Sequence, residues 1–168
     1  MKPKAMCCTL LIVLFAFITL PVVWAGAQNQ IELLSFHWGA LGIVRGQTLR
    51  VSLINIGQER QLPLVSVVVR IHDTQGNVIA QTDETAVAPG QIRYFDFKRE
   101  SLPFTGQTPD RLQFRAVVHV KGNRPDSPED LRRVVAALIP SFELYDQGTG
   151  RTTESGMIGD IRTVISAD

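Results

Sequence analysis

Cysteine is nearly absent from this chain, and both copies, Cys7 and Cys8, lie at its start. Lysine is also scarce, because beyond residue 27 every basic residue except Lys98 and Lys121 is arginine. The 17 Lys and Arg nearly balance the 16 Asp and Glu, so neither a broad basic face for nucleic acid nor an acidic tail is indicated. A hydrophobic share of 45% in 168 residues excludes a wholly disordered chain and supports one ordinary domain.

The N-terminus has the pattern of a secretory signal peptide. A positively charged start precedes an apolar run over residues 7–23, and Ala25 and Ala27 supply the small residues of an A-x-A cleavage site. We therefore predict a signal peptide over residues 1–27, with cleavage after Ala27. The alternative is an uncleaved signal anchor, because the apolar run approaches the roughly 18 residues needed to span a bilayer.

Cleavage would remove both cysteines and change the charge of the mature chain. We expect a secreted or periplasmic protein without a stable membrane span and without disulfides, held together by its apolar core. A thiol nucleophile, a cysteine zinc site and an iron–sulfur cluster are excluded for that form. Loss of Lys2 and Lys4 leaves 15 basic residues against 16 acidic ones, a formal charge of −1.

Apolar and polar residues alternate along several segments after residue 28, which is the period of half-buried β-strands. The clearest examples are residues 65–72 and 112–121. Turn signals separate the segments: Gly76 can supply the positive φ of a hairpin, and Pro89-Gly90 suits the centre of a type II turn. About seven such strands without a long helix between them predict an all-β fold, an antiparallel β-sandwich over residues 28–146; a closed barrel is the alternative.

Three segments depart from this strand pattern. Ser127-Pro128 is typical of a helix start, but the valines and apolar residues that follow indicate one or two turns at most. The last strand is expected within residues 131–145, and Pro140 inside it should lie at an edge or a bulge because it cannot donate to the ladder. Residues 147–168, with scattered glycines among polar residues, are predicted to be a mostly disordered C-terminal tail.

Four motifs follow one another in the order GQTLRVSLINIG, VSVVVRIHDTQGNVIAQT, APGQIRYFDF and RLQFRAVVHV. This order resembles the immunoglobulin-like β-sandwich modules of small exported bacterial proteins of unassigned activity. The strand ending in N-x-G and the A-P-G turn are similar to those of bacterial CARDB-type adhesion-related modules. The resemblance covers about residues 31–146 and implies an immunoglobulin-like sandwich. It implies no particular activity, because its motifs are turn chemistry.

We expect a binding surface on the outer face of one sheet. In an immunoglobulin-like order the third and sixth strands are neighbours, so alternation brings their outward side chains together, with Val68 and Val117 exposed among them. The alternative interpretation is an ordinary hydrated sheet face. The expected members, two of them from the last strand, are Arg70, His72, Arg115, His119, Lys121, Glu143 and Tyr145.

No metal or cofactor site is predicted. His72 and His119 are expected on the same face, but Arg70, Arg115 and Lys121 beside them would repel a cation. The sequence also lacks a Walker loop, a G-x-G-x-x-G motif and a calcium loop.

No catalytic residues are predicted either. A G-x-S-x-G motif is absent, and each histidine lies in or beside a predicted strand without a nearby nucleophile motif. Residues 102–106 match the sortase pattern L-P-x-T-G, but no apolar span follows them, so we interpret them as an inter-strand loop. Phe36, His37 and Trp38 could form an aromatic platform for carbohydrate, although such residues of a first strand more often close the core.

These observations predict an exported, non-catalytic β-sandwich with an interaction or structural role in the cell envelope or outside it. Its partner would be another envelope or extracellular protein, met through the outer sheet face or an edge strand, and not nucleic acid. The alternative is a carbohydrate-binding module or an enzyme that uses the loops around Trp38 and Phe104. A third alternative is a part in an envelope assembly, with the tail as a tether.

Overall fold

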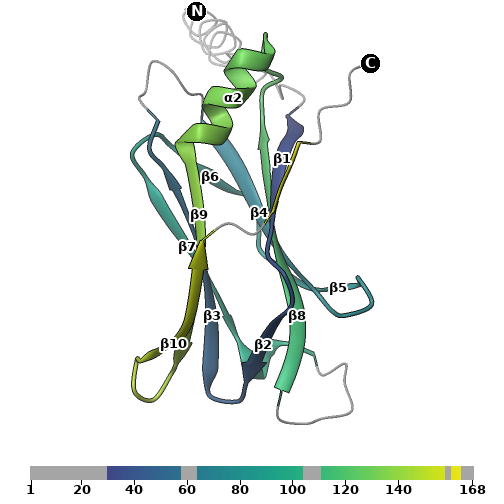
Figure 1. Cartoon of the computed structure of the whole chain (residues 1–168), viewed down its shortest axis with the longest axis vertical. Coiled ribbons are helices and arrows are strands. Elements are labelled where there is room, and N and C mark those ends of the chain that lie inside the picture. Colours follow the sequence, from purple (N-terminus) through teal and green to yellow (C-terminus); the bar gives the residue numbers. More distant parts are fainter. Residues whose placement is uncertain (1–29, 58–63, 104–110, 158–159, 164–168) are drawn as a thin grey trace, which may run out of the picture.

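Two antiparallel sheets packed face to face make up the described part of the chain (Figure 1). The predicted signal peptide, its cleavage residues Ala25 and Ala27, and Phe104 lie outside the described residues. The two packed antiparallel sheets confirm the predicted all-β sandwich for the described residues. The computed structural model describes residues 30–57, 64–103, 111–157 and 160–163.

The larger sheet is built around β8, its longest strand. β1 and β2 pair with successive parts of β8 on one side, and β4 pairs with it on the other. β5 and β6 extend the sheet beyond β4, and β11 extends it beyond β1. Its strands are β1 (Ile31–His37), β2 (Leu41–Val44), β4 (Val65–His72), β5 (Val78–Gln81), β6 (Thr85–Val87), β8 (Arg111–Gly122) and β11 (Asp160–Thr163).

The smaller sheet has the strand order β10-β9-β3-β7. In the immunoglobulin order the first strand lies in the sheet of the second strand, and the last strand lies in the sheet of the sixth. Here β1 pairs with β8, and β9 pairs with β3, so these two strands have exchanged sheets. Its strands are β3 (Gln47–Asn55), β7 (Ile92–Lys98), which a 3-10 helix η1 (Arg99–Ser101) follows, β9 (Leu138–Asp146) and β10 (Thr152–Met157).

The core lies between the sheets and is formed by the inward side chains of the alternating strands. In β4 and β8 these are the apolar sets predicted from the sequence, and they are buried. Phe36 and Trp38 belong to this core, and Trp38 meets Phe142 edge to face, with ring centroids 6.1 Å apart. With Trp38 only 3% exposed, these two aromatic residues form no platform for carbohydrate.

Helix α2 (Pro128–Ala137) is longer than predicted. It begins as expected, with the Ser127 hydroxyl accepting a hydrogen bond from the Asp130 backbone N–H at 3.1 Å. The expected limit of two turns is wrong for this ten-residue helix, because Val134 packs into the core at the end of the sandwich. β9 therefore starts only at Leu138. Pro140 lies opposite Leu53 of β3, and the described pairing of β9 with β10 covers Ser141 to Tyr145.

The prediction of a mostly disordered tail is wrong for the described part of residues 147–168. β10 pairs with β9 and β11 pairs with β1, so the C-terminal segment adds one edge strand to each sheet (yellow in Figure 1). Strand β10 could not be predicted from the sequence, because it has almost no buried residue on either face. It therefore lacks the apolar alternation of a half-buried strand. Backbone hydrogen bonds to a neighbouring edge hold it instead.

Candidate functional site

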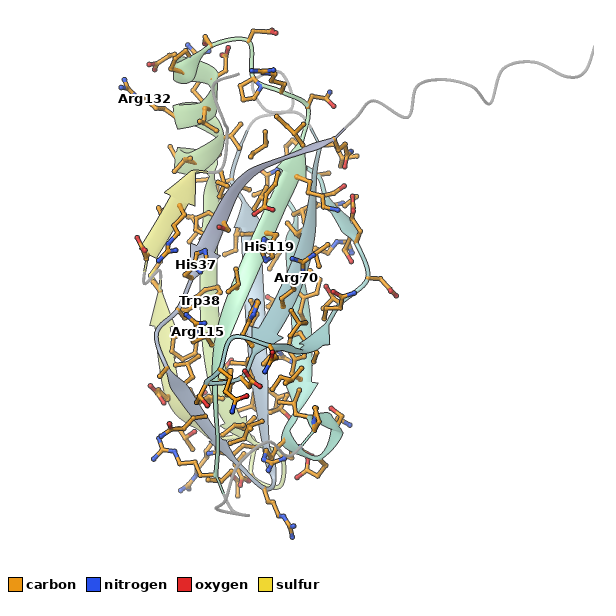
Figure 2. The ribbon with its side chains drawn as sticks, turned by 90° about the vertical axis from the view of Figure 1, so that its right-hand side faces the viewer. His37, Trp38, Arg70, Arg115, His119 and Arg132 are labelled. Atoms are coloured by element: carbon orange, nitrogen blue, oxygen red, sulfur yellow. The ribbon has the colours of Figure 1, made fainter. Side chains whose placement is uncertain are left out.

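The outer face of the larger sheet gathers the three histidines of the chain with several basic side chains. Figure 2 labels four residues of this face, His37, Arg70, Arg115 and His119. His72 lies opposite Arg115, and the next outward pairs along the two strands are Arg70 with Val117, Val68 with His119, and Ser66 with Lys121. The sequence therefore placed five of the seven expected residues correctly on one face. They are Arg70, His72, Arg115, His119 and Lys121.

Tyr145 does not belong to this face, and its expected position is wrong. β9 pairs with β3 in the smaller sheet, where Tyr145 lies opposite Thr48 and Glu143 lies opposite Arg50. Alternation shows which residues of a strand share a side, but it does not show which sheet the strand joins.

Val117 lies at the centre of the outer face. His37 of β1 and Arg70 of β4 flank it on the two neighbouring strands, and Arg115 and His119 are the next outward residues along β8. We call His37, Arg70, Arg115 and His119 the Val117 ring. Val117 itself is only 5% exposed, so the long side chains around it leave little of it in contact with water.

The prediction that Val68 and Val117 are exposed is therefore wrong. Val68, in the neighbouring position on β4, is 8% exposed. Each valine is short and stands between longer polar side chains, which shield it on a sheet face. Around these two valines, the outer face is therefore a polar layer over a small apolar floor.

Two histidines of the Val117 ring have defined hydrogen-bond partners. His119 Nδ1 lies 2.7 Å from the Glu32 carboxylate, which can only accept, so this nitrogen carries a proton. His37 Nε2 lies 2.8 Å from the Ser35 hydroxyl. The other ring nitrogen of His119, Nε2, is buried and has no hydrogen-bond partner among the described residues.

The carboxylates on this face are each engaged by a basic neighbour. Glu84 accepts from Lys121 Nζ at 2.5 Å, and this hydrogen bond holds the pKa of the Glu84 carboxyl below its usual value. Asp160 and Arg162, both on β11, form an ion pair at 3.3 Å. Together with the contact between Glu32 and His119, these pairs use the acidic groups that could have neutralised the Val117 ring.

Arg70 and Arg115 stand out because neither forms an ion pair or a side-chain hydrogen bond within the described part of the chain. The Nε of Arg70 is buried and lacks a hydrogen-bond partner there. The outer face therefore carries two guanidinium groups on adjacent strands whose charge is not balanced by a described carboxylate.

The pKa of His37 reports the electrostatics of this site. It is lowered from its ordinary value of 6.5, first by burial and then by the positive charges of Arg162, His119 and Arg115. Asp160 acts in the opposite direction but does not cancel these effects. The site is therefore locally positive, although the 17 Lys and Arg of the chain nearly balance its 16 Asp and Glu.

A second polar cluster lies on the outer face of the smaller sheet, and sequence analysis missed it. Arg50 forms two hydrogen bonds with Asp96, and its guanidinium carbon lies 5.4 Å from the Tyr94 ring centroid and 5.1 Å from that of Tyr145. Three strands distant in sequence supply these residues, so spacing along the chain could not reveal the cluster. Its charges are already paired, which distinguishes it from the Val117 ring.

A shallow, open depression of about 520 Å³ lies between β9 and β10. Phe142, Glu143 and Met157 are among its lining residues, and no histidine lines it. It therefore does not bring together the histidine and carboxylate side chains that an acid–base enzyme site would need.

Within the described ranges, no group of three or more His, Cys, Asp or Glu side chains is arranged to hold a metal ion. None of the helices described is long and apolar enough to cross a membrane. No protein-family model, curated protein or solved structure matches this chain significantly.

Proposed function

We propose that this protein is an exported, non-catalytic β-sandwich that binds a partner in the cell envelope or outside it through the outer face of its larger sheet. The observation that carries the proposal is the pair of guanidinium groups of Arg70 and Arg115. They lie on adjacent strands and have no carboxylate partner among the described residues.

Unpaired arginines on an ordered strand face favour binding over a merely hydrated surface. The chain contains 16 acidic residues, and those on this face are paired with other basic groups. Arginine presents several N–H donors in a fixed planar arrangement that suits carboxylate, phosphate and sulfate groups. A negatively charged partner would supply the acceptors that the chain itself does not provide.

Export belongs to the same proposal. It is supported by the charged start, the apolar run and the A-x-A pattern that ends at Ala27. Kinship with immunoglobulin-like modules of exported bacterial proteins is also proposed, on the order of the four motifs and the pairing of β4 with β8. The strand exchange of β1 and β9 would make it a variant of that arrangement.

The alternative function, carbohydrate binding or catalysis by the loops at one end, has less support. Its aromatic candidate Trp38 is buried in the core. The open depression between β9 and β10 offers one carboxylate and no histidine. A flat, positively charged face is better suited to contact with a macromolecule than to enclosing a small substrate.

Export can be tested by fractionating cells that produce the protein and sequencing the N-terminus of the product. We expect Gln28 as the first residue of a protein found outside the inner membrane. An intact Met1 in the membrane fraction would contradict both export and cleavage.

The binding face can be tested by comparing capture of partners from an envelope extract by three forms of the purified protein. The forms are the unaltered protein, Arg70→Glu/Arg115→Glu, and the control Arg132→Glu, whose arginine is 80% exposed on helix α2 (Figure 2). Each lost charge-assisted hydrogen bond costs about 1.5–3 kcal/mol, so the double variant should lose more than tenfold in capture. Equal capture by all three forms would overturn the proposed binding face.

A further inference from the structure

We propose that the Val117 ring is a binding site for a tetrahedral oxyanion, a phosphate or sulfate ester group carried by the partner. The inference rests on the proposed role of the outer face and names the chemistry that the face recognises. The residues that would contact the oxyanion directly are Arg70 and Arg115, and the imidazoles of His37 and His119 complete the ring around Val117 (Figure 2).

The register of β4 and β8 places the two arginines on either side of one point. Arg70 lies opposite Val117, and Arg115 lies opposite His72, so the arginines occupy diagonal positions on one face of an antiparallel pair. Such diagonal neighbours lie about 7–8 Å apart, with their β-carbons somewhat closer. Two long side chains at that separation can direct their guanidinium groups to a single anion between them.

The number of donors favours a tetrahedral group over a carboxylate. Each guanidinium can offer two parallel N–H donors, so the pair offers four before any imidazole contributes. A carboxylate has two oxygens and is satisfied by one guanidinium, as Asp96 is by Arg50 in the same molecule. A phosphate or sulfate ester has three terminal oxygens and can accept from both arginines at once.

The charge distribution leads to the same ligand. The carboxylates near the ring are engaged by His119, Lys121 and Arg162, so the charges of Arg70 and Arg115 have no carboxylate counter-ion among the described residues. A phosphate ester carries a charge of about −1.5 to −2 and would neutralise both arginines. The buried Val117 beneath them lowers the local dielectric constant and strengthens this attraction relative to that in water.

The openness of the face indicates an ester group on a larger molecule instead of an enclosed free ion. The ring lies on the side of a sheet that faces away from the core, and its floor is a single valine. Only one side of the anion would be covered by protein, so the rest of the ligand would extend into solvent. This geometry suits a charged group that projects from a partner.

The test uses the fact that the chain contains three histidines, whose imidazole NMR signals can be resolved and assigned. The purified protein is titrated with methyl phosphate, methyl sulfate, inorganic phosphate and acetate at constant ionic strength and pH. We expect saturable shifts of the His37 and His119 signals with both esters, at concentrations where acetate has no effect. Arg70→Gln and Arg115→Gln should each weaken ester binding by about tenfold.

Arg132→Gln is the matched control, because it removes one arginine from helix α2, away from the ring. It should leave ester binding unchanged, and the thermal unfolding of all three variants checks that they remain folded. The oxyanion site is overturned if no ester shifts the two histidine signals, if acetate binds as well as the esters, or if Arg132→Gln weakens binding equally. Binding of inorganic phosphate without methyl phosphate would overturn the assignment to an ester.

Failure of the oxyanion assignment can be distinguished from failure of the proposed binding function. If Arg70→Glu/Arg115→Glu abolishes partner capture but polyglutamate competes with the partner as well as methyl phosphate does, the binding face is retained and the oxyanion assignment fails. If partner capture does not depend on the two arginines, the proposed function itself fails.

Discussion

Arg50 and Asp96 form a two-point ion pair across β3 and β7, with Nε to Oδ1 and Nη2 to Oδ2 each at 2.8 Å. The Tyr94 and Tyr145 rings lie within cation–π distance of the guanidinium group. Because Arg50 stabilises the charged carboxylate, chiefly by the hydrogen bonds it donates, the pKa of Asp96 is below its ordinary value. The pair therefore links the stability of the smaller sheet to pH.

Asp96→Asn should lower the free energy of unfolding by about 1 kcal/mol at pH 7, a value limited by the solvent exposure of the pair. A carboxyl whose pKa is depressed on folding contributes its full stability above the unfolded pKa and loses it as pH falls through the folded pKa. The difference between the variant and the unaltered protein should therefore vanish in strong acid. Urea unfolding at a series of pH values measures it.

The matched control for Asp96 is Glu154→Gln. Glu154 is an exposed carboxylate on β10 whose side chain has no hydrogen-bond or ion-pair partner among the residues described. Its replacement should have little effect at any pH. A loss for Asp96→Asn that persists undiminished at pH 2 would show that the ion pair is not its cause.

Trp38 combines a buried aromatic ring with an indole N–H that has no hydrogen-bond partner in the described part of the chain. Trp38→Ala should cost about 3–5 kcal/mol, because it leaves a cavity beside Phe142. Trp38→Phe should cost much less, since it keeps most of the ring and removes an unsatisfied donor that costs about 1–3 kcal/mol to bury. Equal losses for the two variants, measured by denaturant unfolding, would contradict this account.

Gly156 tests whether β10 is an integral strand of the smaller sheet. A β-carbon at this position would lie 2.5 Å from Phe142 Cε1, so Gly156→Ala must displace an aromatic ring of the core. We expect a loss of about 1–3 kcal/mol and faster amide hydrogen exchange in β10. Gly39→Ala is the control, because its added β-carbon would meet nothing within 4 Å. Unchanged exchange in Gly156→Ala would indicate that β10 is not packed against β9.

The pKa of His37, measured by NMR titration, should lie below 6.5 because burial and the charges of Arg162, His119 and Arg115 disfavour its protonated form. The unfolded chain then binds this proton more readily, so stability is lost as pH falls from 6.5 through the folded pKa. Arg162→Gln removes one positive charge and should raise the pKa of His37. A pKa that does not change in this variant would show that Arg162 does not act on His37.

Much of the fold could be predicted because neighbouring residues encode it. The apolar alternation of residues 65–72 and 112–121 appears as the buried face of β4 and β8, which forms one wall of the core. Gly76 and Gly90 adopt positive φ angles of 93° and 76°, as the turn patterns predict. The same alternation correctly grouped Arg70 with His72 on one outer face.

Other features could not be predicted because they depend on contacts between distant segments. The position of Tyr145 depends on the pairing of β9 with β3. Helix α2 extends as far as Ala137 because Val134 packs into the core. The two C-terminal strands depend on free backbone groups at the sheet edges. Neither a period nor a motif in the sequence carries this information.

By itself, the sequence determined the strand periodicity, the turns and which side chains of a strand share one side, because these follow from alternation and local backbone preferences. Only the tertiary structure decided which strands pair, and with that which charges remain unpaired. His37 joins the Val117 ring because β1 pairs with β8 and not with β3. Strand pairing is selected by the packing of the whole core, in which each strand must find a complementary partner far away in the chain.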